Sequence, residues 1–413
     1  MADLVAPFRG ERYAAVERLS SLIAPPYDVI DQAERARYAA LAAENIVHVM
    51  LPEAPPGDPD GDRYRLAAER LTGWRAKGVL RRDPQPVLYV LAQDFTLPTG
   101  ERLTRRGVFA AVAAEGYEPR RVRPHERTHA GPKADRLALM RATATNIESI
   151  FLLAPDRDRT LANALAGVTR GSPVASAELN GVHIRLWIGE DQSLIPIPES
   201  PLYIADGHHR YETASAYALE SPGGAADRVL ALIVSAHDPG LAVLPTHRVI
   251  FGTGRDVERM LPRWREWFEV QPLAADRDPV AALASIGKGR TACLVADRSQ
   301  ILALLLKPRA LPDRLPSLSQ STAVRDLDVA QIESLVVKEV LGAGMSTPIV
   351  RYVADANEAL GMVQHGGAAV AVLLNPTKVE QVFAVADAGD VMPPKSTYFV
   401  PKVPSGLVLR PLS

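Results

Sequence analysis

Residues 202–214 read Leu-Tyr-Ile-Ala-Asp-Gly-His-His-Arg-Tyr-Glu-Thr-Ala, and this stretch decides how the fold is interpreted. Its first four residues form a short apolar run typical of a buried strand, and Gly207 allows a sharp turn after it. Beyond the turn, Tyr211, Ala214 and Ala218 recur at helical spacing. The pattern therefore predicts a strand, a tight turn and a helix that starts directly after the glycine.

The residue types at this turn suit the binding of an anion. A helix N-terminus directs backbone N–H groups and the positive end of the helix dipole toward one point. The imidazoles of His208 and His209 can bind phosphate oxygens, and Arg210 can hold two oxygens at once. We interpret these three residues and Gly207 as phosphate-binding, with Asp206 orienting a hydroxyl or holding a metal ion. The alternative is a capped turn, in which Asp206 is an N-cap and Arg210 is solvated.

Two other segments carry residues that suit the same chemistry. In the loop Arg123–His129, Glu126 lies among basic side chains, where a carboxylate can act as a general base. Near the C-terminus, Lys395, Ser396 and Thr397 place an amine and two hydroxyls side by side, a set that can hold a carboxylate or a phosphate. For each segment the alternative is an exposed, solvated turn.

The composition and net charge of the chain exclude several classes of function. The 413 residues are 47% hydrophobic and 23% charged, as expected for a globular protein of two or three domains. The formal net charge of −1 argues against nucleic-acid binding. The one cysteine, Cys293, excludes an intramolecular disulfide and a cysteine-rich zinc site. No apolar run approaches the ~20 residues that span a bilayer, and no signal-peptide pattern is present, so we expect a cytoplasmic protein without a membrane partner.

The order of the helix and strand patterns predicts an α/β, or mixed α+β, architecture in three regions. These regions are residues 1–115, 116–255 and 256–413. Residues 120–136 show neither helical nor strand periodicity, which favours a functional loop. A helix is predicted to follow over residues 136–145.

Three segments of the chain resemble segments of known families. Residues 205–214, Pro25–Val29 and Met392–Gly406 resemble DUF1015, a family of unknown function in bacteria and archaea, and the resemblance covers nearly the whole chain. The segment Asp206–Arg210 also resembles the phosphate-binding signature of the ParB/sulfiredoxin superfamily. This implies a ParB/sulfiredoxin-like, nucleotide-binding core in residues 116–255. The first region would then be family-specific, and the third would be an α/β domain that contributes to substrate binding.

Within that superfamily the chain is similar to the free serine kinases, which phosphorylate the hydroxyl of unattached L-serine with a nucleotide. Their Pro-His-Glu, Asp-Gly-His-His-Arg and Pro-Lys-Thr-Thr segments have counterparts, in the same order, at Pro124–Glu126, Asp206–Arg210 and Pro394–Thr397. The resemblance implies that Glu126 takes the hydroxyl proton with assistance from Asp206. It also implies that the second segment binds phosphate and that the third binds the amino acid.

The resulting hypothesis is a kinase that uses ATP or ADP with Mg²⁺, without a protein metal site of its own. Its acceptor would be a small molecule, with free L-serine or a similar amino acid as the first choice. The main alternative is a nucleotide-binding switch of the ParB type, which binds or slowly hydrolyses CTP and does not need Glu126. A third class is an interaction protein that has lost its chemistry and does not respond to nucleotide. The sequence leaves the oligomeric state open.

Overall fold

The computed structural model describes residues 3–54, 62–189, 191, 195–197, 201–252, 257–274, 276–308, 321–341 and 349–412. Its internal contacts divide the chain into two compact units. The first comprises Met1–Pro124, Thr128–Leu241 and Pro401–Ser413, and the second comprises His125–Arg127 and Ala242–Val400. Both units mix helices and strands, which confirms the predicted mixed α/β class. The division into three regions stays a prediction.

The helices and strands of the first unit follow one another closely along the chain. In order they are β1 (Val5–Ala6), β2 (Glu11–Tyr13), η1 (Val16–Arg18), α1 (Leu19–Leu22), η2 (Tyr27–Val29), α2 (Gln32–Leu41), α3 (Val47–Met50), α4 (Arg63–Ala76), β3 (Leu80–Arg82), β4 (Leu88–Thr96), β5 (Arg102–Ala113), β6 (Val122–Arg123), α5 (Ala130–Thr143), β7 (Thr145–Asn146), β8 (Ile150–Ala154), α6 (Thr160–Val168), β9 (Ala175–Leu179), β10 (Val182–Gly189), β11 (Leu202–Asp206), α7 (His208–Glu220), η4 (Gly224–Asp227), β12 (Arg228–Ser235) and β21 (Arg410–Pro411).

The second unit has its own set of elements. In order they are β13 (Ala242–Leu244), β14 (His247–Phe251), α8 (Val257–Trp267), β15 (Phe268–Pro272), α9 (Pro279–Ile286), β16 (Ala292–Ala296), β17 (Ile301–Leu306), α10 (Thr322–Arg325), α11 (Asp328–Ile332), η5 (Glu333–Val337), α12 (Lys338–Leu341), β18 (Ile349–Val353), α13 (Ala356–Gln364), β19 (Val370–Leu374), α14 (Val379–Asp387) and β20 (Tyr398–Val400).

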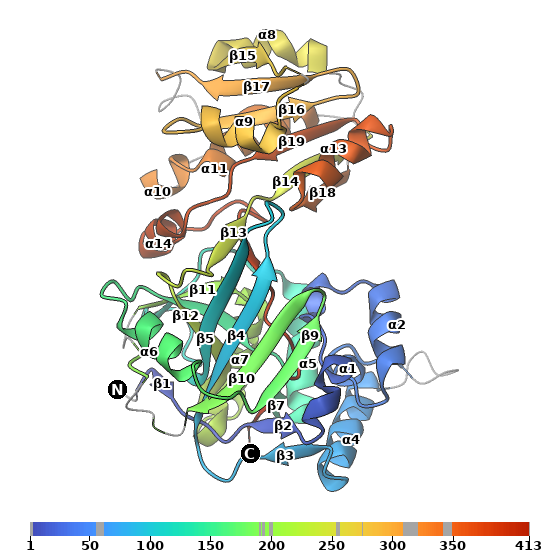
Figure 1. Cartoon of the computed structure of the whole chain (residues 1–413), viewed down its shortest axis with the longest axis vertical. Helices are drawn as coiled ribbons and strands as arrows, with labels where there is room; N and C mark the ends of the chain where they lie inside the picture. Colours follow the sequence, from blue (N-terminus) through green and yellow to red (C-terminus); the bar gives the residue numbers. More distant parts are fainter. Residues whose placement is uncertain are drawn as a thin grey trace. The chain divides into compact units, whose positions relative to one another are not determined.

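A nine-stranded sheet is the centre of the first unit (Figure 1). Its strand order is β6-β11-β8-β12-β5-β4-β10-β9, with β1 pairing on β5. The pairs β11–β6 and β12–β8 are parallel and the others are antiparallel. The long strands β4 and β5 form a hairpin, and Gly100 in its turn has a positive φ of 86°.

The two faces of this sheet differ in what covers them. Helix α7 covers one face, since its Tyr211 packs with Ala92 of β4 and Val108 of β5 in one apolar core. Side chains alternate between the faces along a strand. Gln93 and Arg105, which are paired across β4 and β5, therefore point to the opposite face.

The C-terminal segment, residues 401–412, lies against that opposite face. The Nε2 of Gln93 donates to the carbonyl oxygen of Lys402 at 3.0 Å. Further along, β21 pairs with β7, and Val408 approaches Tyr89 beside Gly10. The segment is thereby held along its length, and it brings residues from the end of the chain to the middle of the sheet.

Local predictions around the sheet hold with two linked exceptions, because the loop predicted over residues 120–136 contains strand β6 and the first turns of α5. The strand, turn and helix predicted from residue 202 onward are confirmed as β11 and α7. The helix predicted over residues 136–145 instead begins at Ala130, so the predicted start is wrong by two turns. Gly131 and Pro132 resemble helix breakers, but proline is tolerated in the first turn, where its missing N–H has no partner to lose.

The second unit is built on a six-stranded antiparallel sheet of order β15-β17-β16-β19-β14-β18. Helix α13 packs Ala359 and Val363 against Leu294 and Leu373 of this sheet. The free thiol of Cys293 is buried in β16, and burial raises its pKa far above the usual range. Among the described residues, no helix combines the length and the hydropathy that crossing a membrane requires.

Candidate functional site

Asp206 ends strand β11, and a bulge sets its direction. Ile204 pairs with Leu152 of β8, whereas Asp206 pairs with Phe151, so one extra residue of β11 is inserted between these two pairs. Bulges re-aim the side chains that follow them. Because Leu152 belongs to the core under α7 and Phe151 alternates with it, the bulge puts Asp206 on the face that carries the C-terminal segment.

The turn after Asp206 requires glycine. Gly207 has a φ of +91°, a conformation that side chains rarely adopt. A Cβ at this position would also lie 3.1 Å from the Cζ of Arg210, whose side chain folds back over the turn. From there, Nη2 of Arg210 donates to Oδ2 of Asp206 at 2.6 Å, and Nη1 donates to the carbonyl oxygen of Ser149. The start of α7 is thus locked to the end of β11.

Lys402 is the second cation on Asp206. Its Nζ donates to Oδ1 at 2.8 Å, so each carboxylate oxygen accepts from a different cation. Burial raises the pKa of Asp206, but the charges of Lys402 and Arg210 outweigh this effect and hold the pKa well below its usual range. The side chains of Asp206 and Lys402 are 19% and 17% exposed, so the pair is mostly shielded from water. Asp206 is therefore a fixed negative charge with both oxygens engaged.

A second buried carboxylate, Glu148, lies near Arg210. Its Oε1 accepts from the backbone N–H of Tyr27 at 3.0 Å and from the hydroxyl of Ser405 at 3.4 Å. Its Oε2 accepts from Nη1 of Arg136 at 3.4 Å. Burial raises the pKa of Glu148, against the opposing charges of Arg210 and Arg136. Glu148 consequently joins the loop at residue 27, helix α5 and the C-terminal segment at one point.

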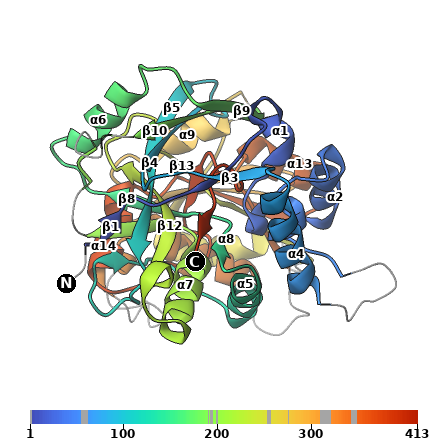
Figure 2. The same cartoon turned by 90° about the horizontal axis from the view of Figure 1, so that it is seen from below.

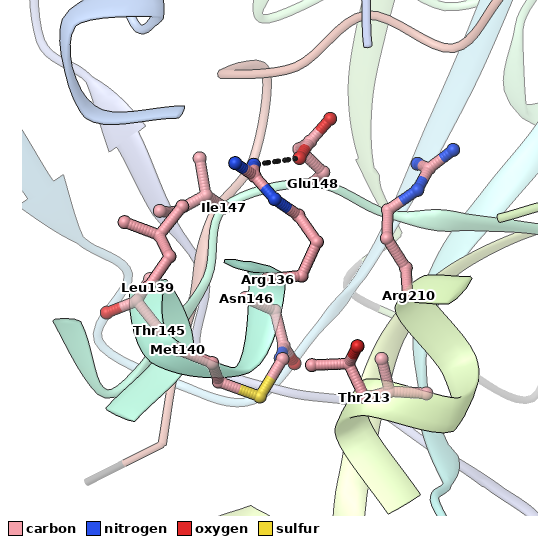
Figure 3. A pocket seen from close by; sticks show the side chains of 10 residues that line it. Arg136, Leu139, Met140, Thr145, Asn146, Ile147, Glu148, Arg210 and Thr213 are labelled. Carbon is pink, nitrogen blue, oxygen red and sulfur yellow. Dashed lines mark hydrogen bonds and ion pairs between the residues drawn. The ribbon is translucent and has the colours of Figure 1, made fainter. Parts of the chain in front are cut away.

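A cavity of about 30 Å³ lies between Arg136, Glu148 and Arg210 (Figure 3). Thr213 Oγ1 and Asn146 Nδ2 belong to residues that line it, and neither atom has a hydrogen-bond partner among the described residues. A volume of this size suits about one or two water molecules. It is too small to hold a nucleotide.

Helices α5 and α7 lie side by side (Figure 2), and a hydrogen bond joins their N-terminal ends. The backbone N–H of His129, which caps α5, donates to Nε2 of His209 in the first turn of α7 at 2.8 Å. This bond requires a His209 ring that is unprotonated at Nε2, in agreement with a pKa that burial and His129 lower. Glu212 accepts from the hydroxyl of Thr128 at 2.6 Å and from Nζ of Lys133 at 2.8 Å. Two positive helix ends therefore point at one region.

Glu126 lies in the segment His125–Arg127, which belongs to the second unit. Nε2 of His125 is hydrogen-bonded to Oγ1 of Thr397 at 3.2 Å, and the N–H of Met392 donates to the carbonyl oxygen of His125 at 2.8 Å. The structure thus brings together two of the three segments that the sequence singled out.

The residues around Lys395 form a tight turn. Lys395 is exposed and has a φ of +56°, which is unusual for a residue with a side chain. Ser396 is buried: its hydroxyl donates to the carbonyl oxygen of Pro393 at 2.6 Å, and its own carbonyl oxygen accepts from Thr377 at 2.8 Å. These bonds hold the turn and leave the Lys395 side chain directed outward.

The residues of the first unit do not fit a bound Mg²⁺. Both oxygens of Asp206 accept from cations, and a divalent ion needs free oxygen ligands. Within the part of the chain that the structure describes, no group of three or more His, Cys, Asp or Glu side chains could hold a metal ion. We therefore derive no step through Mg²⁺.

Sequence reasoning missed three members of this cluster, namely Lys402, Glu148 and Arg136. Lys402 lies in the segment Pro401–Pro404, whose prolines indicate a turn. The sequence nevertheless favoured Lys395 as the binding residue, because two hydroxyl residues follow it. Glu148 and Arg136 carried no local signal, because a buried ion pair is formed by the fold and not by a motif.

Three solved structures are similar to this chain at low identity. They are a free serine kinase in complex with AMP (16% identity, TM-score 0.36, 71% of this chain and 87% of that chain), a conserved hypothetical protein from Pyrococcus furiosus (17%, 0.36, 72% and 93%) and a C-terminally truncated SbnI from Staphylococcus aureus (12%, 0.39, 74% and 87%). Because these TM-scores are below 0.5, no functional argument rests on them. No curated protein matches the chain. Residues 5–330 match the model described as "Protein of unknown function (DUF1015)", and the chain therefore belongs to that family.

Proposed function

We propose that this protein transfers a phosphoryl group from a nucleotide, ATP or ADP, to the hydroxyl of a small molecule, with free L-serine or a similar amino acid as the acceptor. The observation that carries the proposal is the charge cluster at the start of α7. There a re-aimed carboxylate, Asp206, is held between Arg210 and Lys402 beside two positive helix ends. Phosphoryl transfer depends mainly on positioning and on neutralising the charge of the phosphates. A ParB/sulfiredoxin-like core in residues 116–255 is part of the same proposal.

The first unit would bind the nucleotide phosphates. Backbone N–H groups at Gly207 and His208 would donate hydrogen bonds to the phosphate oxygens at the helix N-terminus. His209, which is neutral and accepts at Nε2, would donate from Nδ1. Arg210 would supply positive charge without leaving Asp206, whose negative charge assists by holding both cations in place.

The second unit would hold the acceptor. Lys395 would bind the carboxylate of the amino acid, and Ser396 and Thr397 would shape the turn that carries it. Glu126 would take the proton of the acceptor hydroxyl. The hydroxyl oxygen then forms a bond to the terminal phosphorus, the bond from that phosphorus to the bridging oxygen breaks, and the shortened nucleotide leaves with the electron pair.

The test is a transfer assay with Glu126→Gln. Purified protein receives ATP, ADP or CTP with L-serine, L-threonine or no acceptor, and phosphoamino acid and released nucleotide are quantified together by mass spectrometry. Loss of a general base typically lowers the rate ~10²–10⁴-fold. Glu118→Gln, an exposed glutamate in the preceding loop, is the matched control and is expected to keep full activity.

Two results would count against the proposal. Equal phosphoamino acid formation by Glu126→Gln and the unmodified protein would remove Glu126 from the mechanism. Nucleotide turnover or binding without any phosphorylated acceptor, above all with CTP, would instead favour the nucleotide-binding switch.

A further inference from the structure

A buried arginine on the sheet face that carries Asp206 is not used by the mechanism above. Arg105 of β5 is 1% exposed, and its Cζ lies 4.6 Å from the centre of the Phe151 ring. Its Nη2 donates to Oε1 of Gln93, but Nε and Nη1 have no hydrogen-bond acceptor among the described residues. Burial lowers the pKa of Arg105 to about 9, against the charges of Asp238 and Asp206, so the side chain is protonated at neutral pH.

Among the described residues, no carboxylate accepts a hydrogen bond from the Arg105 guanidinium. Asp206 acts on Arg105 electrostatically, but its two oxygens already accept from Arg210 and Lys402. Three cations, Arg105, Arg210 and Lys402, therefore share the charge of Asp206.

Asp238, the other carboxylate that acts on Arg105, is bound elsewhere. Its oxygens accept from the backbone N–H groups of Gly240 at 2.9 Å and of Arg106 at 3.3 Å. Burial raises the pKa of Asp238 to about 6. Asp238 acts on Arg105 through its charge, and it accepts no hydrogen bond from this guanidinium.

A buried guanidinium with unused donors is unfavourable, because burial removes the water that would solvate its charge. A ligand can supply the missing partner, and perturbed charges of this kind cluster at functional sites. The donors of Arg105 lie on the Phe151 face, and the bulge turns Asp206 to this same face, where Lys402 donates to it. The ligand that fits is an anion with oxygen acceptors.

We propose that Arg105 binds an oxyanion of the ligand, a phosphate or a carboxylate group, which accepts a hydrogen bond from the unused N–H groups of its guanidinium. This inference rests on the proposed function and deepens it, because it names a residue for the nucleotide phosphate or for the carboxylate of the amino acid. Gln93 and Phe151 are positioning residues, since they hold the guanidinium in place from two sides.

The experiment is calorimetric titration of the full chain at 25 °C with two probes, inorganic phosphate and L-serine, which separate the two sources of the oxyanion. Arg105→Met keeps a similar length without the charge. We expect it to weaken binding of the probe that the site takes by roughly tenfold to a hundredfold, the range for a hydrogen bond to a charged group. We expect its melting temperature without ligand to equal or exceed that of the unmodified protein, because an unpaired buried charge is gone.

Arg105→Lys and Arg410→Lys form a matched pair. Arg410 is also buried, and its Nε lacks a partner among the described residues, but its two Nη atoms donate to three protein acceptors, Oδ1 of Asn146 and the carbonyl oxygens of Arg228 and Ala225. Arg105→Lys is expected to weaken binding about tenfold, since an ammonium does not reproduce the geometry of the guanidinium. Arg410→Lys is expected to lower the melting temperature and to leave binding unchanged.

The proposal is overturned if the unmodified protein binds neither probe, if Arg105→Met and Arg105→Lys bind as the unmodified protein does, or if Arg410→Lys weakens binding to the same extent. The transfer assay separates this failure from failure of the proposed function. Phosphoamino acid formation with unaltered binding by Arg105→Met would overturn only the role of Arg105. If Arg105→Met loses binding while no assay, including that of the unmodified protein, yields a phosphorylated acceptor, only the proposed kinase function would be overturned.

Discussion

Asp206→Asn removes the one charge that Arg210 and Lys402 share at distances of 2.6 and 2.8 Å. Asparagine keeps the shape and one acceptor oxygen, but its amide N–H₂ then faces a cation. Lys402 and Arg210 then remain mostly buried without the carboxylate to which both donate, and Arg210 keeps the weaker attraction of Glu148 and Asp28. The prediction is a large loss of stability in the first unit.

The magnitude follows from burial. Removing one partner of a fully buried ion pair costs about 3–5 kcal/mol. Since the side chains of Asp206 and Lys402 are 19% and 17% exposed, we expect the lower end, about 3 kcal/mol. The matched control is Asp94→Asn, whose pair with Arg185 at 2.7 Å is one-third exposed and should cost about 0.2–1 kcal/mol.

The assay is amide hydrogen exchange read by mass spectrometry, which measures the free energy of opening for each unit separately. Peptides from β8, β11 and β12 report the first unit, and peptides from β16 and β19 serve as an internal control that should not change. Because the charges lower the pKa of Asp206, its stabilisation is present above about pH 3.9, the pKa of an unfolded aspartate, and is lost as the pH falls below it. The difference between Asp206→Asn and the unmodified protein should thus be constant from pH 5 to pH 8.

A second substitution makes the reasoning refutable. Adding Lys402→Met to Asp206→Asn removes one of the two cations that faced the carboxylate. The double variant should regain at least about 1 kcal/mol of the lost free energy of unfolding. A loss below about 1 kcal/mol in Asp206→Asn, or a double variant no more stable than the single one, would show that the charges are solvated and not held as a buried cluster.

Two further predictions concern the glycine turn and a buried histidine. Gly207→Ala should destabilise the first unit by about 1–3 kcal/mol, because alanine must adopt a φ of +91° and its Cβ would lie 3.1 Å from Arg210. Hydrogen exchange in α7 measures this loss, and an unchanged exchange rate would refute the prediction. In the second unit, burial and Arg248 lower the pKa of His247 to about 4, so its stabilising neutral form is present above the unfolded pKa of about 6.5 and is lost as the pH falls toward 4. The opening free energy of β14 and β19 should therefore fall between pH 6.5 and pH 4, and His247→Asn, which keeps an acceptor for the N–H of Leu374, should remove this dependence.

Local patterns in the sequence were sufficient for the elements with a clear period. The strand, turn and helix predicted from residue 202 onward are β11 and α7. Such elements depend on hydrogen bonds and apolar spacing within a few residues, so one window of sequence contains the cause. The same holds for Gly207, because a sharp turn between a strand and a helix calls for a residue that tolerates a positive φ.

Other features depend on partners that lie far away in the chain. Strand β12 is a continuous buried run between β8 and β5, and its apolar residues show no alternation that would reveal a strand. The bulge that turns Asp206 exists only through the pairing with β8. A window of sequence around either element does not contain the strand that gives it its geometry.

The sequence by itself determined which segments are candidates to carry the chemistry, and the tertiary structure decided which of their side chains meet. Asp206 and Lys402 are 196 residues apart and form an ion pair because the C-terminal segment lies on one face of the sheet. The same reason applies to Arg105 and Glu148. Their charges are important because the fold buries them, and not because of their neighbours in sequence. The energy of a buried charge depends on the three-dimensional arrangement of partners and solvent, which no local pattern of residues records.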